Sequence, residues 1–453
     1  MENKKRYERP VVLKQFSGFM NKFGSRPTTA TRTEVDGIPV NELVEKYGSP
    51  LFVISERKIR ENQRRANRIF KTRYPKVQFA WSYKTNYLNA VCSIFHQEGS
   101  WAEVVSGFEY DKARSLGVKG EHIIFNGPDK DKPALRRAIS EGSKIHIDHF
   151  DELYDIIEIA AELDKKAIVA IRVNMDTGIY PKWDRFGFNY ENGEAKQALR
   201  RIMTSPGLKL TGLHTHIGTY MMSVDAYKIA ADKMVELAGW LKKEYDHILD
   251  YIDLGGGFPS NNTLNGQYLP AEQILPTLEQ FADAITTSLL ELPYPKDELP
   301  VLFLETGRAL IDDAAHLIST VLAMKRLSDG RRAMIIDAGV NLLFTKFWYK
   351  HQITPAQDGG MMTEETAIYG PLCMNIDVMA ESITLPVMKK GDKVVIDYVG
   401  AYDMTQWMQF IQMRPNVVMI MEDKSIVLVR EAESLEYLAT NEKLPEKLRN
   451  FKI

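Results

Sequence analysis

Lys84 directly follows an apolar run, VQFAWSY at residues 77–83, and could act as a nucleophile at the end of a buried strand. An ammonium group in an apolar pocket is desolvated, which lowers its pKa and lets the amine attack a carbonyl carbon. A surface lysine is the ordinary alternative for this residue taken alone. The interpretation therefore depends on which other residues lie at the same place in the fold.

Two glycine-containing segments further along the chain are typical of an anion site. Three consecutive glycines, Gly255–Gly257, follow an apolar run, and Gly307 is followed directly by Arg308. Glycines let backbone N–H groups approach an anion closely, and an arginine adds a positively charged fork. Glycine clusters also occur as simple strand-end turns, and an internal ion pair between Glu305 and Arg308 is the ordinary alternative for the second segment.

His214 and His216 are two residues apart, so on a strand they would point to the same face. Such a pair could bind a metal, but no third ligand is evident at a suitable spacing, and we expect no metal site. An imidazole that stacks on an aromatic cofactor ring is the alternative. Glu305, which also ends an apolar run, could then pair with a nitrogen of that ring.

These residues stand at the ends of strand-like runs. Short β-branched or aromatic runs alternate with segments whose apolar residues recur at three- and four-residue steps. The predicted strands are 77–83, 101–106, 122–126, 144–148, 167–174, 209–217, 251–256 and 301–307. Eight strands, each followed by a helix, predict an α/β fold of the TIM (β/α)8 barrel type, whose active sites lie at the C-terminal ends of the strands.

After about residue 310 the pattern changes to strand-like runs without regular helices. We therefore expect an N-terminal extension of mobile character at residues 1–36, a barrel at 37–310 and a C-terminal β-rich domain, sandwich- or barrel-like, at 311–453. Residues near 37–52 are candidates to pack with the β-rich domain.

Composition limits the class of protein. A net charge of −2 gives no attraction to nucleic acid or to an anionic membrane surface. No run approaches the ~20 consecutive apolar residues of a membrane span, and the charged N-terminus lacks the apolar core of a secretory signal. Glu2 and Glu8 disfavour an organelle transit peptide, and the two cysteines, Cys92 and Cys373, cannot form a disulfide framework. We expect a cytoplasmic protein that acts on a small molecule.

In the order of these residues the chain resembles the fold-type III pyridoxal-phosphate decarboxylases, the diaminopimelate, ornithine and arginine decarboxylase group, and diaminopimelate decarboxylase most. The resemblance runs from about residue 37 to 430. The segments that carry it are FAWSYKTN, WAEVVSGFE, IIFNGPDK, IRVN, RFGF, GLHTHIGT, IDLGGGF, LETGRAL, IIDAGVN, YGPLCMNID and GDKVVIDYVGAYDM. It implies a carboxy-lyase that uses pyridoxal 5'-phosphate and an amino-acid substrate.

The resemblance also implies roles for individual residues. Lys84 would bind the cofactor covalently, His216 would stack on its ring and Glu305 would pair with its pyridine nitrogen. The residues implied for cofactor binding are Lys84, His216, Thr219, Gly255, Gly256, Gly257, Glu305, Gly307, Arg308 and Tyr402. Cys373 would enter the site of a partner subunit and protonate the substrate carbon after carbon dioxide leaves. This implies a homodimer with shared active sites, in which Lys84, His216 and Cys373 are the catalytic residues.

The residues implied for substrate binding are Arg308, Tyr349, Met374 and Asp377, and here the chain departs from its family. Diaminopimelate enzymes usually have Glu-Ser-Gly-Asp after the cysteine, where this chain has Met374-Asn375-Ile376-Asp377, and the arginine expected four residues before Tyr349 is Thr345. Neutral replacements leave a charged distal group of the substrate poorly paired.

We therefore expect either the lysine-forming reaction or decarboxylation of a related diamino or derivatised amino acid, such as a modified amino acid of a secondary-metabolite or siderophore pathway. An amino-acid racemase and a non-catalytic pyridoxal-phosphate-binding protein are the alternatives.

Overall fold

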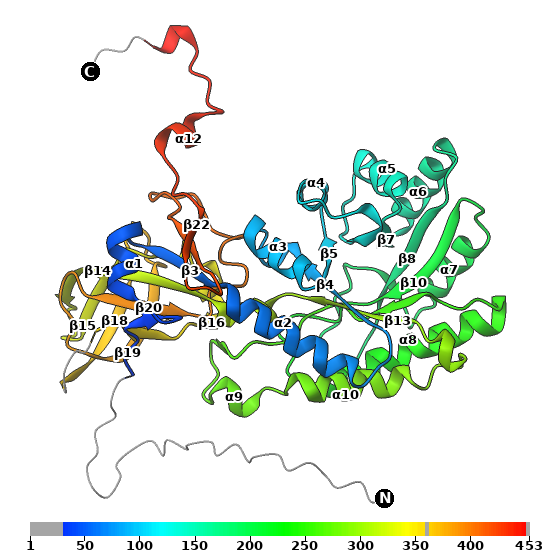
Figure 1. The fold of residues 1–453 in the computed structure, drawn as a ribbon, viewed down its shortest axis with the longest axis horizontal. Helices are drawn as coiled ribbons and strands as arrows, with labels where there is room; N and C mark the ends of the chain where they lie inside the picture. The colour runs from blue at the N-terminus through cyan, green and yellow to red at the C-terminus, as the bar shows by residue number, and fades with distance from the viewer. Residues whose placement is uncertain (1–29, 358–361, 450–453) are drawn as a thin grey trace, which may run out of the picture.

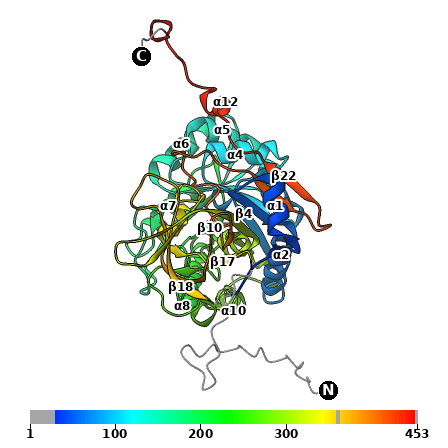
Figure 2. The same cartoon turned by 90° about the vertical axis from the view of Figure 1, so that its left-hand side faces the viewer.

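The structure is a computed structural model that describes residues 30–357 and 362–449. Its larger part is a closed barrel of parallel strands with helices on the outside (Figures 1 and 2). The barrel strands are β4 (Val77–Ser82), β5 (Trp101–Val104), β6 (Ile123–Phe125), β7 (Lys144–Ile147), β8 (Ala167–Asn174), β10 (Leu208–His214), β11 (Tyr251–Asp253) and β13 (Val301–Thr306). The pairing of β10 with β8 closes the sheet. Each of the eight strands overlaps one predicted from the sequence, so the predicted TIM barrel is confirmed.

One predicted strand is too long. The run 209–217 was expected to be a single strand, but β10 ends at His214, and His216 lies in the connection that follows. The two histidines therefore do not share the face of one strand. They meet at the same cavity through different elements, as described below.

The helices around the barrel form where the sequence combines an apolar stripe with a capping residue. The Ser106 side chain accepts a hydrogen bond from the Glu109 N–H at the start of α4 (Gly107–Ser115), and Asp131 does the same for Ala134 at the start of α5 (Lys132–Glu141). The other long helices are α2 (Glu56–Lys71), α3 (Asn89–Gln97), α6 (Phe150–Glu162), α7 (Glu194–Met203), α8 (Val224–Tyr245) and α10 (Leu278–Leu289).

A second, β-rich region lies beside the barrel (Figure 1). Its main strands are β14 (Ala315–Arg326), β15 (Arg332–Ile336), β17 (Ile353–Pro355), β18 (Thr363–Tyr369), β19 (Val378–Pro386), β20 (Lys393–Asp397), β21 (Val417–Ile420) and β22 (Ile426–Arg430). The N-terminal strand β3 (Leu51–Ser55) pairs with β14 and with β21 inside this sheet. From β3 the chain therefore leaves the β-rich region, enters the barrel through α2 and returns to the β-rich region after β13. The domain limits drawn from the sequence stay predictions, and residues 1–29 of the N-terminal extension lie outside the described residues.

The remaining strands and helices are short. They are β1 (Glu34–Val35), β2 (Ile38–Pro39), α1 (Val40–Tyr47), β9 (Phe188–Asn189), β12 (Thr263–Leu264), α9 (Ala271–Ile274), α11 (Arg308–Ile311), β16 (Tyr349–Lys350) and α12 (Leu435–Ala439). Within the described ranges, none of the helices combines the length and the apolar character that a bilayer crossing requires.

β3 lies in the middle of the β sheet, so its side chains are buried and stabilise the fold. Phe52 is fully buried, and its ring packs edge-to-face on Trp407 with 5.9 Å between the centroids. We expect Phe52→Ala to lower the free energy of unfolding by about 3 kcal/mol or more, because it leaves a cavity in a packed core. Thermal unfolding measured by circular dichroism checks this. The matched control is Val427→Ala on the outer strand β22, where the side chain is 45% exposed and the change should stay within about 0.5 kcal/mol. Equal loss in both variants would contradict the central role of β3.

Candidate active site

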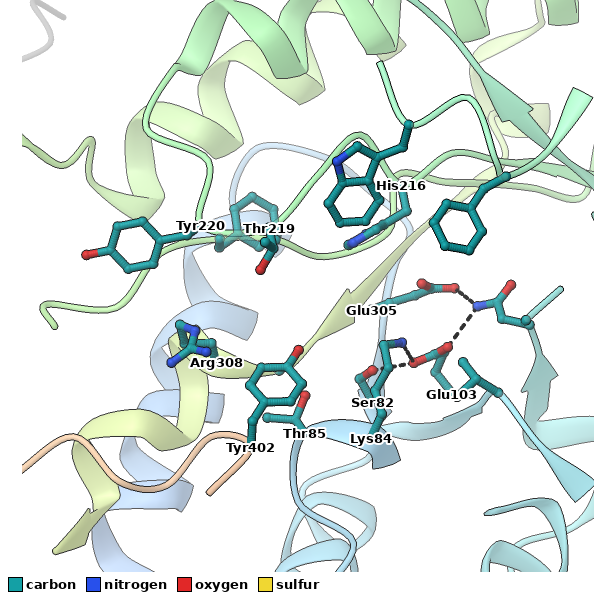
Figure 3. Close-up of a pocket in the computed structure, with 18 of the residues that line it drawn as sticks. Ser82, Lys84, Thr85, Glu103, His216, Thr219, Tyr220, Glu305, Arg308 and Tyr402 are labelled. Carbon is teal, nitrogen blue, oxygen red and sulfur yellow. Dashed lines mark hydrogen bonds and ion pairs between the residues drawn. The ribbon is translucent and has the colours of Figure 1, made fainter. Parts of the chain in front are cut away.

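A cavity of ≈ 680 Å³ lies where the barrel strands end and the β-rich region begins. Residues of β4, β5, β8, β10 and β13, and Asn126 just after β6, line it together with residues of the β-rich region (Figure 3). The residues predicted from the sequence that line it are Lys84, His216, Thr219, Gly257, Glu305, Gly307, Arg308, Tyr349 and Tyr402. Residues distant in sequence are thus brought to one place, as the barrel fold requires.

Lys84 lies on the single helical turn Tyr83–Thr85 that follows β4, and its amine points into the cavity. Lys84 Nζ donates a hydrogen bond of 2.7 Å to Glu103 Oε2 at the end region of β5. Burial alone would lower the pKa of Lys84, but the Glu103 and Glu305 carboxylates outweigh it and raise the pKa. The expectation of a lowered pKa was therefore wrong, because no local pattern indicated that Glu103 faces the lysine.

The backbone around Lys84 is bonded to the β-rich region. Thr405 Oγ1 donates to the Lys84 carbonyl oxygen at 2.9 Å, and the Tyr402 N–H donates to the Thr85 carbonyl oxygen at 2.8 Å. Tyr402 has a φ of 72°, a conformation that few residues other than glycine adopt. These bonds hold the Tyr402 ring at the cavity and fix the turn that carries Lys84.

Glu305, on β13, is 5% exposed and belongs to a network of buried polar groups. The Asn126 side-chain amide donates to Glu305 Oε1 and also, at 3.0 Å, to Glu103 Oε1. His214 Nε2 lies 3.5 Å from Glu305 Oε2. Burial and the charge of Arg172 lower the pKa of His214 well below its usual value, so its ring is neutral. The carboxylate of Glu305 is therefore held in place mainly by the amide of Asn126.

The structure brings a third potential metal ligand to this network, which the sequence did not reveal. Ligand atoms of His146, His214 and Glu305 lie within 4.8 Å of one another. His146 comes from β7, and its ring stacks on that of His214 with 4.6 Å between centroids. Because imidazole lone pairs lie in the ring plane, two stacked rings do not direct them at a common point, and we assign no metal to the group.

His216 lies across the cavity from Lys84 (Figure 3). Its Nδ1 accepts a hydrogen bond of 3.1 Å from the Gly256 N–H, which leaves the proton on Nε2. Burial, together with the positive charges of Arg172 and Lys84, lowers the pKa of His216 to about 3. A neutral, flat ring held by the backbone is suited to stacking on an aromatic group.

The other end of the cavity is built for an anion. Arg308 is 8% exposed, and its guanidinium carbon lies 4.1 Å from the ring centroid of Tyr349 and 5.0 Å from that of Tyr402. Its Nη1 lies 3.3 Å from Asp312 Oδ2, whereas its Nε has no hydrogen-bond partner within the described residues. The alternative of a Glu305–Arg308 ion pair is therefore wrong. A buried guanidinium with a free N–H fits the phosphate of a cofactor.

Glycine is required next to this end. Gly257 has a φ of 98°, and a Cβ there would lie 2.2 Å from the Gly218 carbonyl oxygen. A Cβ on Gly256 would lie 2.1 Å from the Glu305 carbonyl oxygen. Of the three glycines only Gly257 lines the cavity, while Gly256 packs on β13 and the Gly255 N–H donates to Asp253 Oδ1. The glycine run thus allows the strand ends to pack closely around the anion site.

Three predicted site residues lie apart from the cavity of their own chain. Cys373 is exposed in the connection between β18 and β19. Met374 follows it, and Asp377 is buried with its carboxylate accepting the N–H groups of Val340 and Leu372 at 2.8 Å each. Asp377 therefore shapes the loop that carries Cys373. The roles given to these three residues stay predictions.

Five aromatic residues that were not predicted from the sequence form one wall of the cavity. Tyr180, Trp183 and Phe186 lie in the connection after β8, Tyr220 lies after β10 and Trp348 precedes β16, and all five line the cavity. They lie in irregular segments, where no periodic pattern marks a buried face. The only available signal was the density of aromatic residues in YPKWDRFGF.

Comparisons with known proteins agree with this geometry. The family model of the pyridoxal-dependent decarboxylases, pyridoxal binding domain, matches residues 56–312. The diaminopimelate decarboxylases of Methanocaldococcus jannaschii and Methanothermobacter thermautotrophicus are 31% and 29% identical to the chain, each match covering 91% of it and 95% and 96% of the relative. The crystal structure of the M. jannaschii enzyme in co-complex with L-lysine superposes with a TM-score of 0.84 at 29% identity, over 93% of this chain and 99% of that one. Because the family model spans more than half of the chain, the protein belongs to the pyridoxal-dependent decarboxylases of fold-type III, whose cofactor is pyridoxal 5'-phosphate.

Proposed function

We propose that the cavity at the barrel end removes the α-carboxyl group of an amino acid as carbon dioxide, with Lys84 as the residue that binds the cofactor. The observation that carries the proposal is the placement of an amine, Lys84 Nζ, and a buried carboxylate, Glu305, on one cavity that also holds the anion site at Arg308. The relatives named above are diaminopimelate decarboxylases, so diaminopimelate is the reference substrate against which others should be compared.

The residues present fit the cofactor. Lys84 would form the covalent bond, the neutral ring of His216 would stack on the pyridine ring, and Glu305 would keep a proton on the pyridine nitrogen. The phosphate would be bound by Thr219, Gly257, Gly307, Arg308 and Tyr402. Gly255 and Gly256, which were also predicted to bind it, already donate their N–H groups to Asp253 Oδ1 and His216 Nδ1 and would support the site from behind. The bound cofactor supplies the electron sink that accepts the electrons of the broken carbon–carbon bond.

Glu103 is positioned to act as the proton acceptor of Lys84, a role that was not predicted from the sequence. An ammonium cannot attack a carbonyl carbon, so Lys84 must lose a proton first. Glu103 Oε2 is 2.7 Å from Lys84 Nζ and can accept that proton. Asn126 donates a hydrogen bond to each of the two carboxylates and so holds both in position during the proton transfer.

The position of Cys373 supports a homodimer with shared active sites as part of this proposal. Cys373 is exposed and is not among the residues that line the cavity of its own chain. Large apolar side chains are also exposed nearby in the sequence or at the cavity mouth, including Ile376 at 52% and Trp348 at 49%. Exposed apolar groups of this size are typical of surfaces that meet another protein.

Loss of the Lys84 amine should abolish both the cofactor bond and the reaction. We expect Lys84→Ala to lack the visible absorbance band of lysine-bound pyridoxal phosphate and to release no carbon dioxide from any amino acid. Lys132→Ala is the matched control, since the Lys132 side chain is 54% exposed and is not among the residues that line the cavity. A band that persists in Lys84→Ala would overturn the assignment of this lysine.

Loss of the Glu305 charge should affect the chemistry more than cofactor binding. We expect Glu305→Gln to retain the absorbance band but to lower kcat by about 100-fold, because a preorganised charge at the pyridine nitrogen is removed. The control is Glu298→Gln at an exposed position. Unchanged kcat in Glu305→Gln would contradict the role of Glu305.

Shared active sites can be tested by mixing two inactive variants. Cys373→Ala should lower kcat by about 100-fold or more, as expected for loss of a general acid. Unfolding and refolding the Cys373→Ala variant together with the Lys84→Ala variant should restore activity. In each mixed dimer, Lys84 of one subunit and Cys373 of the other form one intact site. If the mixture stays as inactive as its components, Cys373 does not act across a subunit interface.

A further inference from the structure

We infer that the substrate is an α-amino acid whose side chain ends in a neutral, conjugated group, such as an acylated amine, and not in a free ammonium or carboxylate. The inference rests on the proposed function, because it concerns the same cavity. It depends on where the charges of the cavity lie and on what already neutralises them.

The charged groups that line the cavity in the described parts of the chain are paired with one another or with groups behind them. Lys84 is bonded to Glu103, and Glu305 accepts from Asn126. Arg172 Nη1 lies 3.6 Å from Asp148 Oδ1, and its guanidinium packs on Phe186. These groups lie at the Lys84 end of the cavity, where the cofactor ring would bind.

Arg308 is the remaining cation of the lining, and it is also committed. Its Nη1 is 3.3 Å from Asp312 Oδ2, and the cofactor phosphate would take the rest of its charge. Figure 3 shows Arg308 beside Tyr402 and apart from Lys84 and Glu305. A distal carboxylate of the substrate would therefore have to compete with the phosphate for this one guanidinium.

The rest of the lining has no formal charge. It consists of aromatic, apolar and neutral polar side chains, namely Tyr180, Trp183, Phe186, Tyr220, Met222, Phe258, Leu264, Thr345, Trp348, Tyr349 and Gln406, together with small residues. We call the six residues Tyr180, Trp183, Tyr220, Met222, Leu264 and Trp348 the neutral wall. A charged group placed against such a wall loses its hydration without gaining a partner.

Thr345 does not bring a hidden charge to this wall. Its Oγ1 donates a hydrogen bond of 2.6 Å to Asp403 Oδ1, and the Asp403 side chain is fully buried behind it. Burial raises the pKa of Asp403 above its usual value, and Asp403 is not among the residues that line the cavity. The position at which diaminopimelate enzymes usually have an arginine is thus occupied by a neutral threonine whose hydroxyl is bonded to Asp403.

A second copy would add no free charge through the Cys373 loop. Met374, Asn375 and Ile376 are uncharged, and the carboxylate of Asp377 is already bonded to the backbone of its own loop. Two aromatic residues of the lining, Trp183 and Trp348, are also partly exposed, at 37% and 49%. A conjugated side chain could pack its neutral end on these rings.

The test compares substrates that differ only at the distal end. Carbon dioxide release is measured for racemic Nε-acetyl-lysine, racemic lysine and diaminopimelate with the cofactor-loaded enzyme. We expect kcat/KM for Nε-acetyl-lysine to exceed that for lysine and for diaminopimelate by at least about tenfold. Isothermal titration calorimetry of the same compounds with Lys84→Ala, loaded with pyridoxal phosphate, gives a readout that needs no turnover and should show the same order of affinity.

A pair of variants tests the neutral wall itself. Trp348→Glu places a carboxylate at a half-exposed position that the fold should tolerate, and Trp348→Gln is its uncharged match. We expect the ratio of kcat/KM for lysine over Nε-acetyl-lysine to be about tenfold higher in Trp348→Glu than in Trp348→Gln, because only the carboxylate can pair with the ammonium. Equal ratios in the two variants would remove Trp348 from the wall and overturn the inference.

The outcomes separate the inference from the proposed function. Higher kcat/KM or tighter binding for diaminopimelate or lysine would overturn the inference while leaving decarboxylation intact. If no amino acid releases carbon dioxide although the cofactor band is present, the proposed function fails. The calorimetric order of affinity then still decides whether the cavity prefers a neutral distal group.

Discussion

Two buried carboxylates, Glu103 and Glu305, face the same cavity, and the site depends on how their mutual repulsion is balanced. The Asn126 amide donates a hydrogen bond to each of them, and the Lys84 ammonium donates one to Glu103. Together these contacts turn an unfavourable charge pair into a network in which each carboxylate is hydrogen-bonded. The same two carboxylates raise the pKa of Lys84 against the effect of burial, so the network favours the charged form of the lysine.

The barrel supplies this network, but the β-rich region fixes it. Tyr402 and Thr405 bond to the backbone of the turn that carries Lys84, and Asn86 donates to the Gly400 carbonyl oxygen at 3.1 Å. The chain links the two regions twice. β3 of the β sheet leads directly into α2 before the first barrel strand, and β14 follows the last barrel strand. A site built this way is rigid at the lysine, where the covalent bond would form, and open toward the mouth.

The lining of the cavity contains two kinds of side chain. Its charged groups are each hydrogen-bonded to or close to a partner, and the rest of the lining carries no formal charge. Under the proposed function the first kind would hold the cofactor and the second would face the remainder of the substrate. Specificity then follows from a cost: a free charge against the neutral wall would be desolvated without a partner. The reaction type can thus be retained in a family while the accepted side chain changes.

The sequence by itself determined the eight barrel strands and the order of Lys84, the glycine run, Glu305 and Arg308 along them, because strand periodicity and polar strand ends are local patterns. Only the tertiary structure decided that Glu103 faces Lys84, that His146 stacks on His214 and that Arg308 pairs with Asp312. The contact between Asn126 and Glu305 joins residues 179 positions apart, and no local pattern encodes such a distance. The length of β10 and the aromatic wall were decided at the same level, since barrel closure and loop packing choose which side chains of an irregular segment face inward.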